Sequence, residues 1–150
     1  MAEAERNMIE ELRELVRERR RFPIEAYLFL YQALDAAQRM VGEKRHVSGA
    51  ELCEGFRRLA VEQFGPLALM VLNHWGMRRT DDVGEMVFNL VARDLMGKTD
   101  KDRLEDFDGV YDFEEAFAPQ AILATQSLTE LVPAFKLALK DLPGGRRSPT

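Results

Sequence analysis

Residues 46–76 read HVSGAELCEGFRRLAVEQFGPLALMVLNHWG, and this stretch decides the fold. The Ser48 hydroxyl can accept a hydrogen bond from the backbone three residues on, and Glu51 can accept one from the backbone of Ser48. Apolar residues then recur at spacings of three and four, which places them on one face of a helix. Gly65 predicts a left-handed stop, and Pro66 suits the first turn of a second helix. The sequence therefore predicts two helices that meet at a Gly-Pro corner.

The second of these helices is almost wholly apolar. Residues 67–72 contain no polar side chain. The run is much shorter than the roughly 20 residues that a helix needs to cross a bilayer. We therefore expect it to be buried inside the domain, with no side facing water, and to be closed by Trp75 and Gly76.

Amphipathic periodicity predicts further helices on both sides of this stretch. Thr80, Asp81 or Asp82 is expected to cap the helix that follows it, and Gly97 is expected to end that helix. A capping-box pattern at Ser127 opens a last helix. The additional helices are expected over residues 4–20, 23–41, 81–96 and from 127 onward.

The fold class predicted from these elements is mainly α. We expect a compact multi-helix domain of about six helices in residues 1–142, with a disordered tail over 143–150. Weak alternation after residue 96 leaves open a short β-hairpin, which would make the arrangement winged-helix-like. No repeat or linker divides the chain.

Composition limits the setting in which this chain can work. The chain has 150 residues, enough for one domain with a real core. It has a single cysteine, Cys53, which cannot form an intramolecular disulfide and favours a reducing, cytoplasmic location. The N-terminus is charged from Glu3 onward, so we expect neither a secretory signal nor a membrane partner.

Charge is divided unevenly along the chain. Residues 80–115 carry twelve carboxylates against four Lys or Arg side chains, within a net charge of -5. An acidic surface of this kind repels phosphate and attracts cations or a basic partner over about 8 to 10 Å in ordinary salt. Nucleic acid is therefore not favoured as a partner for this segment.

The acidic segment contains one pattern with metal-binding spacing. Residues 104–115 read LEDFDGVYDFEE. In the twelve-residue calcium loop of EF-hands, the candidate ligands would stand at positions three, five, nine and twelve. Position one is Leu104 in place of the usual aspartate, so a solvated acidic loop is the alternative to a site for calcium or another divalent cation. The candidate metal ligands are Asp106, Asp108, Asp112 and Glu115.

Basic and aromatic residues give a second set of candidates, for protein interaction or anion binding. A histidine at a helix end more simply complements the helix dipole, and a run of arginines before Phe22 is more simply a solvated helix end. No glycine-rich phosphate loop, HExxH or GxSxG motif is present, so no catalytic residue is predicted. The candidate interaction residues are Arg57, Arg58, His46, His74, Trp75, Arg78 and Arg79.

The quoted stretch, together with TDDVGEMVFNLV and DFDGVYDFEEAF, resembles an uncharacterised bacterial protein family restricted to planctomycetes and verrucomicrobia. The resemblance covers residues 22–117. It implies a bacterial cytoplasmic protein and supplies no catalytic residue.

Taken together, these patterns favour a non-catalytic interaction or regulatory module that self-associates or binds a protein with a basic surface. Exchange between subunits is expected in the segment that holds Phe117, Ile122, Leu123 and Leu128. Two alternatives stay open. One is a winged-helix-like nucleic-acid binder that would use Arg57, Arg58, Arg78 and Arg79. The other is a metal-binding protein or metal-dependent enzyme that would use the acidic residues 100–115.

Overall fold

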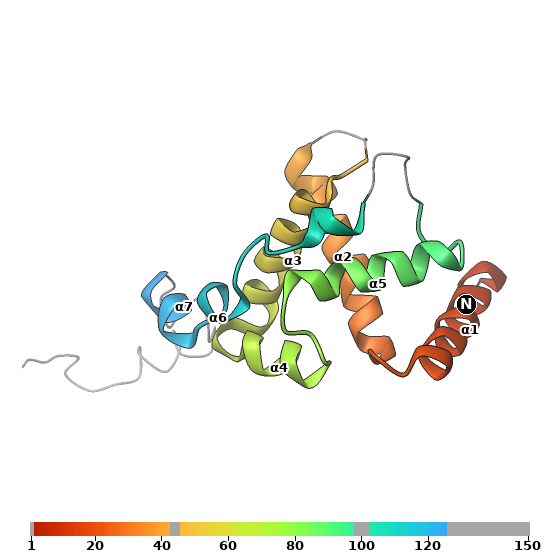
Figure 1. The fold of residues 1–150 in the computed structure, drawn as a ribbon, viewed down its shortest axis with the longest axis horizontal. Coiled ribbons are helices and arrows are strands. Elements are labelled where there is room, and N and C mark those ends of the chain that lie inside the picture. The colour runs from red at the N-terminus through yellow and green to blue at the C-terminus, as the bar shows by residue number, and fades with distance from the viewer. Residues whose placement is uncertain (1, 43–45, 98–102, 126–150) are drawn as a thin grey trace, which may run out of the picture.

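The computed structural model of the chain describes residues 2–42, 46–97 and 103–125 (Figure 1). Within these ranges the regular elements are α-helices and 3₁₀-helices, and no strand occurs. The elements are α1 (Glu3–Arg19), α2 (Ile24–Val41), α3 (Gly49–Phe64), η1 (Gly65–Leu67), α4 (Ala68–His74), α5 (Thr80–Ala92), η2 (Leu104–Phe107), α6 (Phe113–Ala116) and α7 (Pro119–Thr125).

The mainly α class is confirmed, whereas the number of about six helices and the short hairpin are not confirmed. Residues 103–112, where part of a hairpin would lie, form η2 and turns instead. The expected last helix from Ser127 and the tail over 143–150 lie outside the described residues. In the described ranges, no helix is both long enough and apolar enough to span a membrane.

The core is built on the antiparallel pair α2 and α3. Phe29 in the first half of α2 stacks on Phe64 at the end of α3, with ring centroids 5.4 Å apart. Further along, Gly55 of α3 faces Ala37 of α2, and a Cβ atom added to Gly55 would lie only 2.8 Å from the Ala37 backbone nitrogen. The two helices approach this closely because a glycine stands at their contact.

The start of α3 confirms the predicted capping box. The Glu51 N–H donates to the Ser48 hydroxyl at 3.1 Å, and the Ser48 N–H donates to the Glu51 carboxylate at 2.9 Å. At the other end, Gly65 has a positive φ of 52° and Pro66 lies in the first turn of η1. The corner therefore lies where the sequence predicts it, because both signals are local to the backbone.

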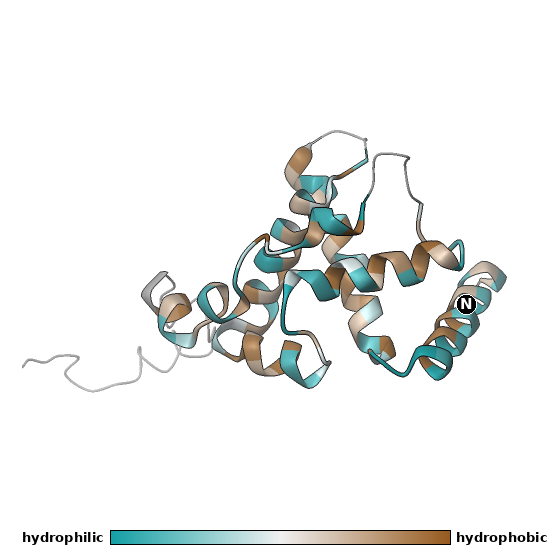
Figure 2. Cartoon of the chain, viewed as in Figure 1, coloured by the Kyte–Doolittle hydropathy of each residue, from teal (hydrophilic) through white to brown (hydrophobic). Residues whose placement is uncertain are grey.

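The prediction that residues 67–72 are buried on all sides is wrong. Ala68 and Leu72 are fully buried, but Leu67 is 55% exposed and Met70 is 65% exposed. The segments η1 and α4, which are mostly brown in Figure 2, lie at an edge of the domain, where α4 packs on α3 and η1. A helix covered on one side buries one stripe of residues, here at spacing four, and leaves the opposite stripe in solvent.

The start and the end of α5 both differ from the prediction. Its N-cap is Arg79, and Asp82 stands at the third helical position, where its carboxylate accepts the Arg79 N–H at 3.1 Å. Thr80 is fully buried and donates its hydroxyl proton to the Phe107 carbonyl at 2.6 Å. The helix ends at Ala92, before Gly97, and the backbone turns at Asp94 with a φ of 57°.

Candidate interaction surfaces

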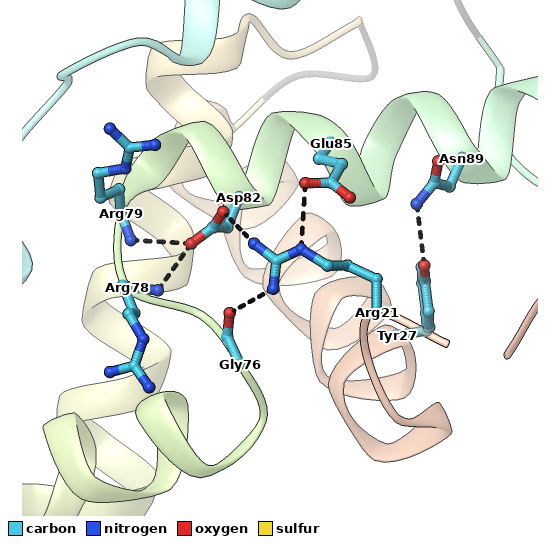
Figure 3. A network of polar contacts seen from close by, with 8 residues as sticks. All are labelled: Arg21, Tyr27, Gly76, Arg78, Arg79, Asp82, Glu85 and Asn89. Carbon is cyan, nitrogen blue, oxygen red and sulfur yellow. Dashed lines mark hydrogen bonds and ion pairs between the residues drawn. The ribbon is translucent and has the colours of Figure 1, made fainter. Parts of the chain in front are cut away.

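A polar network fixes the corner between α4 and α5 to the junction of α1 and α2 (Figure 3). Arg21 donates from one terminal nitrogen to Asp82 at 3.0 Å and from the other to the Gly76 carbonyl at 3.0 Å. The second carboxylate oxygen of Asp82 accepts the backbone N–H groups of Arg78 at 2.7 Å and Arg79 at 3.1 Å. Asp82 is buried and satisfied on both oxygens, so its role is structural.

A second buried polar contact joins the same elements. The Asn89 side chain of α5 donates to the Tyr27 hydroxyl of α2 at 3.1 Å (Figure 3). Burial raises the pKa of Tyr27 above its usual range, so the hydroxyl stays protonated at neutral pH. Together with the Arg21 network, this contact holds α5 across α2.

His74 and Trp75 lie beside the basic run that precedes Phe22. They line a hollow of about 420 Å³ together with Arg20 and Arg21. The Trp75 ring packs on Phe29, with centroids 5.6 Å apart, so it serves the core and shows only part of its surface. The arrangement brings the candidates His74 and Trp75 together with arginines that the sequence did not connect to them.

The other basic candidates are spread over separate places. Arg57 and Arg58 on α3 both bind Glu54, at 2.9 Å and 3.0 Å, and these hydrogen bonds, led by that of Arg57, lower the pKa of the Glu54 carboxyl. The side chains of Arg78 and Arg79 are exposed at a different hollow, which Tyr111 and Asp112 also line. His46 lines a hollow at the start of α3, whereas His74 lines the separate hollow beside Trp75, so the two histidines do not form a joint site.

The predicted acidic segment, residues 80–115, is not exposed throughout, because Asp82 in its first part is buried, but its last part, residues 103–115, lies on the surface. All six carboxylates of this last part are exposed. The aromatic residues between them point inward, and Phe107, Phe113 and Phe117 are 5%, 2% and 0% exposed. The Tyr111 hydroxyl donates to the Cys53 carbonyl at 2.7 Å. Aromatic residues thus attach the segment to α3 and leave its charges in water.

The four candidate metal ligands are not gathered around one point. Asp106 accepts the Arg103 N–H at 3.1 Å, and Asp112 accepts the Glu114 N–H at 2.8 Å as the cap of α6. Partial desolvation, and then the nearby Asp81 carboxylate, raise the pKa of Asp108. Among residues 2–42, 46–97 and 103–125, no group of three or more His, Cys, Asp or Glu side chains could hold a metal ion. The metal site stays a prediction that this geometry does not favour.

Cys53 is fully buried in α3. Burial, and to a smaller extent the charge of Asp81, raise the pKa of the thiol to about 12. The thiolate is the reactive form of cysteine, so this side chain is inert at neutral pH.

Among the described residues, the two most exposed large apolar side chains are Met70 of α4 and Leu67 of η1. Leu67 and Met70 are one helical turn apart, and α7, which packs against η1, adds Leu123 at 47% exposure. We call these three residues the apolar surface. Periodicity could not have found it, because apolar residues at helical spacing look the same whether or not a neighbouring element covers them.

The residues that sequence reasoning missed are Arg21 and Asp82. The basic run suggested a solvated helix end, and Asp82 suggested a cap. Asp82 lies three residues after Arg79, which is the spacing of a capping box, so its place at the third helical position could have been predicted. Nothing in the sequence links Asp82 to an arginine 61 residues away.

Comparison of the chain with protein-family models, with curated proteins and with solved structures finds no match. The resemblance to a planctomycete and verrucomicrobial family therefore stays a prediction.

Proposed function

We propose that this chain is a non-catalytic interaction module that self-associates through the apolar surface of Leu67, Met70 and Leu123. The observation that carries the proposal is the exposure of Leu67 and Met70, at 55% and 65%, in a stretch without a polar residue. Grouped apolar side chains on a protein surface mark interaction sites more often than isolated ones do. A symmetric pair would place the same surface of two copies in contact.

The area that a stable dimer must bury indicates that further residues take part in the contact. A stable dimer buries about 800 Å² on each partner, which is more than three side chains can supply. The chain continues from Thr125 at the edge of the apolar surface, and residues 127–140 read SLTELVPAFKLALK, with apolar residues at helical spacing. We propose that this segment supplies the remaining area by exchange between subunits. Its apolar residues include Leu128 and Phe135.

The exposed acidic segment supports a further part of the proposal. Its six carboxylates over residues 103–115 face water and are opposed there by one basic residue, Arg103. A protein partner with a basic surface would be attracted to it, and nucleic acid would be repelled. A cytoplasmic bacterial location belongs to the same proposal, supported by the single cysteine.

The test is the mass of the full-length chain in solution, measured by light scattering after gel filtration. We expect a dimer for the natural chain and a loss of dimer for the Leu67→Lys/Met70→Lys double variant, because charges would then be buried at the contact. The matched control is Met40→Lys/Leu104→Lys. It changes the same residue types, 40% and 47% exposed, at the opposite end of the domain.

Four results bear on the proposal in different ways. A natural chain that elutes at 17.2 kDa at every concentration contradicts self-association. An equal loss of dimer in the control contradicts the location of the contact. Salt-dependent retention on duplex DNA that Arg78→Glu/Arg79→Glu abolishes would favour the nucleic-acid alternative. A rise in melting temperature with calcium would favour the metal-binding alternative.

A further inference from the structure

An apolar hollow of about 370 Å³ lies at the end of the domain opposite to the apolar surface. It is bounded by the second half of α2, the start of α3, the second half of α5 and η2. Its wall is formed by aliphatic and aromatic side chains from all four elements, among them Leu34, Leu52, Val87, Val91 and Phe107. The hollow is therefore part of the packed body and continuous with the core.

The wall residues differ in how far they are covered. Leu52, Val87 and Phe107 are 4%, 9% and 5% exposed, while Leu34 and Val91 are half-buried. Apolar surface left next to water in this way is unfavourable, and a ligand that fills the hollow removes that surface from water.

Three polar side chains line the hollow. Gln38 comes from the last turns of α2, His46 precedes α3, and Ser48 caps α3. The Ser48 hydroxyl accepts the Glu51 N–H and keeps its own proton available for donation. No hydrogen bond is made by the Gln38 side chain within the described residues. A ligand with one polar group could be oriented by these side chains.

The volume limits the size of such a ligand. An apolar cavity of about 150 Å³ engineered into another protein stays dry and binds benzene. The hollow here is more than twice that volume, which corresponds to an apolar body of roughly 15 non-hydrogen atoms on the same scale. A strongly polar metabolite would not fit this wall, because its groups would lose water without gaining partners.

We propose that the hollow between α2, α3, α5 and η2 binds a small amphiphile, whose apolar body lies against Val91 and Phe107 and whose single polar group faces Gln38 and Ser48. This site is independent of the proposed self-association, because it lies at the other end of the α2 and α3 pair. It adds ligand binding to the interaction role.

The probe is 1-aminoanthracene, a fluorescent amine with a flat apolar body of the required size. It should bind the full-length chain with a rise in fluorescence, and decanol should displace it. The blocking variant is Gly97→Trp. Gly97 lines the hollow, and a Cβ atom added there meets no other atom within 4 Å, so the larger side chain can enter the space without disturbing the fold.

We expect Gly97→Trp to weaken probe binding by roughly tenfold or more, equivalent to about 1.4 kcal/mol. Ala92→Trp is the matched control, since Ala92 is exposed at the end of α5 and does not line the hollow. Val91→Trp is a second blocking variant, in which a larger side chain on α5 fills the hollow. Circular dichroism and thermal unfolding establish that each variant is folded.

Three results would overturn the proposal. The first is the absence of saturable binding to the natural chain. The second is unchanged binding in folded Gly97→Trp and Val91→Trp, and the third is an equal loss of binding in Ala92→Trp. The mass measurement above tests self-association separately, so failure of one proposal leaves the other standing.

Discussion

The helices α3 and α4 are joined by a single 3₁₀ turn and are both rich in apolar residues, yet their environments differ. In α3 the apolar stripe that contains Phe56 and Ala60 is fully buried against α2. In α4 one stripe is equally buried, but Met70 on the opposite side is 65% exposed. The difference shows that an apolar helix is buried only on the sides that neighbouring elements cover.

The largest expected effect contrasts Phe56→Ala with Met70→Ala. Phe56 is fully buried and packs on Phe29, with ring centroids 5.1 Å apart, so truncation leaves a cavity and should cost about 3 to 5 kcal/mol. Met70→Ala, studied at concentrations where the chain is monomeric, should change stability by less than about 0.5 kcal/mol. Urea unfolding measures both free energies. Similar costs for the two variants would show that α4 is as well covered as α3.

A smaller effect is expected at the corner that follows α4. Asp82→Ala removes the acceptor of Arg21 and of two backbone N–H groups, which should cost about 2 to 3 kcal/mol. The neighbouring Asp81→Ala is the control. Asp81 accepts one hydrogen bond at 3.2 Å and lies near Asp108, so its loss should be almost neutral. Equal effects in thermal unfolding would argue against the network as the anchor of this corner.

The contact of α2 and α3 can be tested with one methyl group. Gly55→Ala places a Cβ atom 2.8 Å from the backbone of Ala37, so the two helices must separate. Overpacking costs about 1 to 3 kcal/mol, and the better helix propensity of alanine returns up to about 1 kcal/mol. We expect a net loss of about 1 to 2 kcal/mol in urea unfolding. Gly97→Ala, which meets no atom within 4 Å, should be near neutral.

The smallest effect, about 1 kcal/mol between pH 9 and pH 10, concerns the buried thiol of Cys53 at alkaline pH. Burial raises the pKa of Cys53 from 9.0 to about 12, so unfolding releases a proton in this range. The contribution of the buried thiol is fully present below pH 9 and is lost as the pH rises towards 12, by roughly 1.4 kcal/mol per pH unit. The cost of Cys53→Ala should therefore shrink between pH 9 and pH 10 in urea unfolding. A constant cost would mean that the thiol ionises in the folded chain.

Sequence reasoning succeeded where the interacting groups are close in the chain. The capping box of Ser48 and Glu51 and the Gly-Pro corner depend on backbone geometry within a few residues, and both are present. The exposure of residues 103–115 was also predictable, because six carboxylates in thirteen residues cannot all be paired locally.

Sequence reasoning failed where distant parts of the chain decide the outcome. Asp82 is a buried partner of Arg21 across 61 residues, and no periodicity contains that pairing. Met70 is exposed because no described element covers that side of α4. The apolar hollow is formed by four elements and could not be seen in any one of them. Each of these features is a property of packing between elements.

The central claim is that the exposed side of α4 contacts a second copy of the chain. Spectra of isotope-labelled methionine methyl groups, recorded over a range of concentrations, test it directly. Met70 and Met40 are both exposed, at 65% and 40%, but only Met70 lies on the apolar surface, and Met77 is fully buried as an internal reference. We predict that the Met70 methyl signal shifts and broadens with concentration while the Met40 signal does not. A Met70 signal that stays unchanged, or that changes no more than that of Met40, would contradict the account.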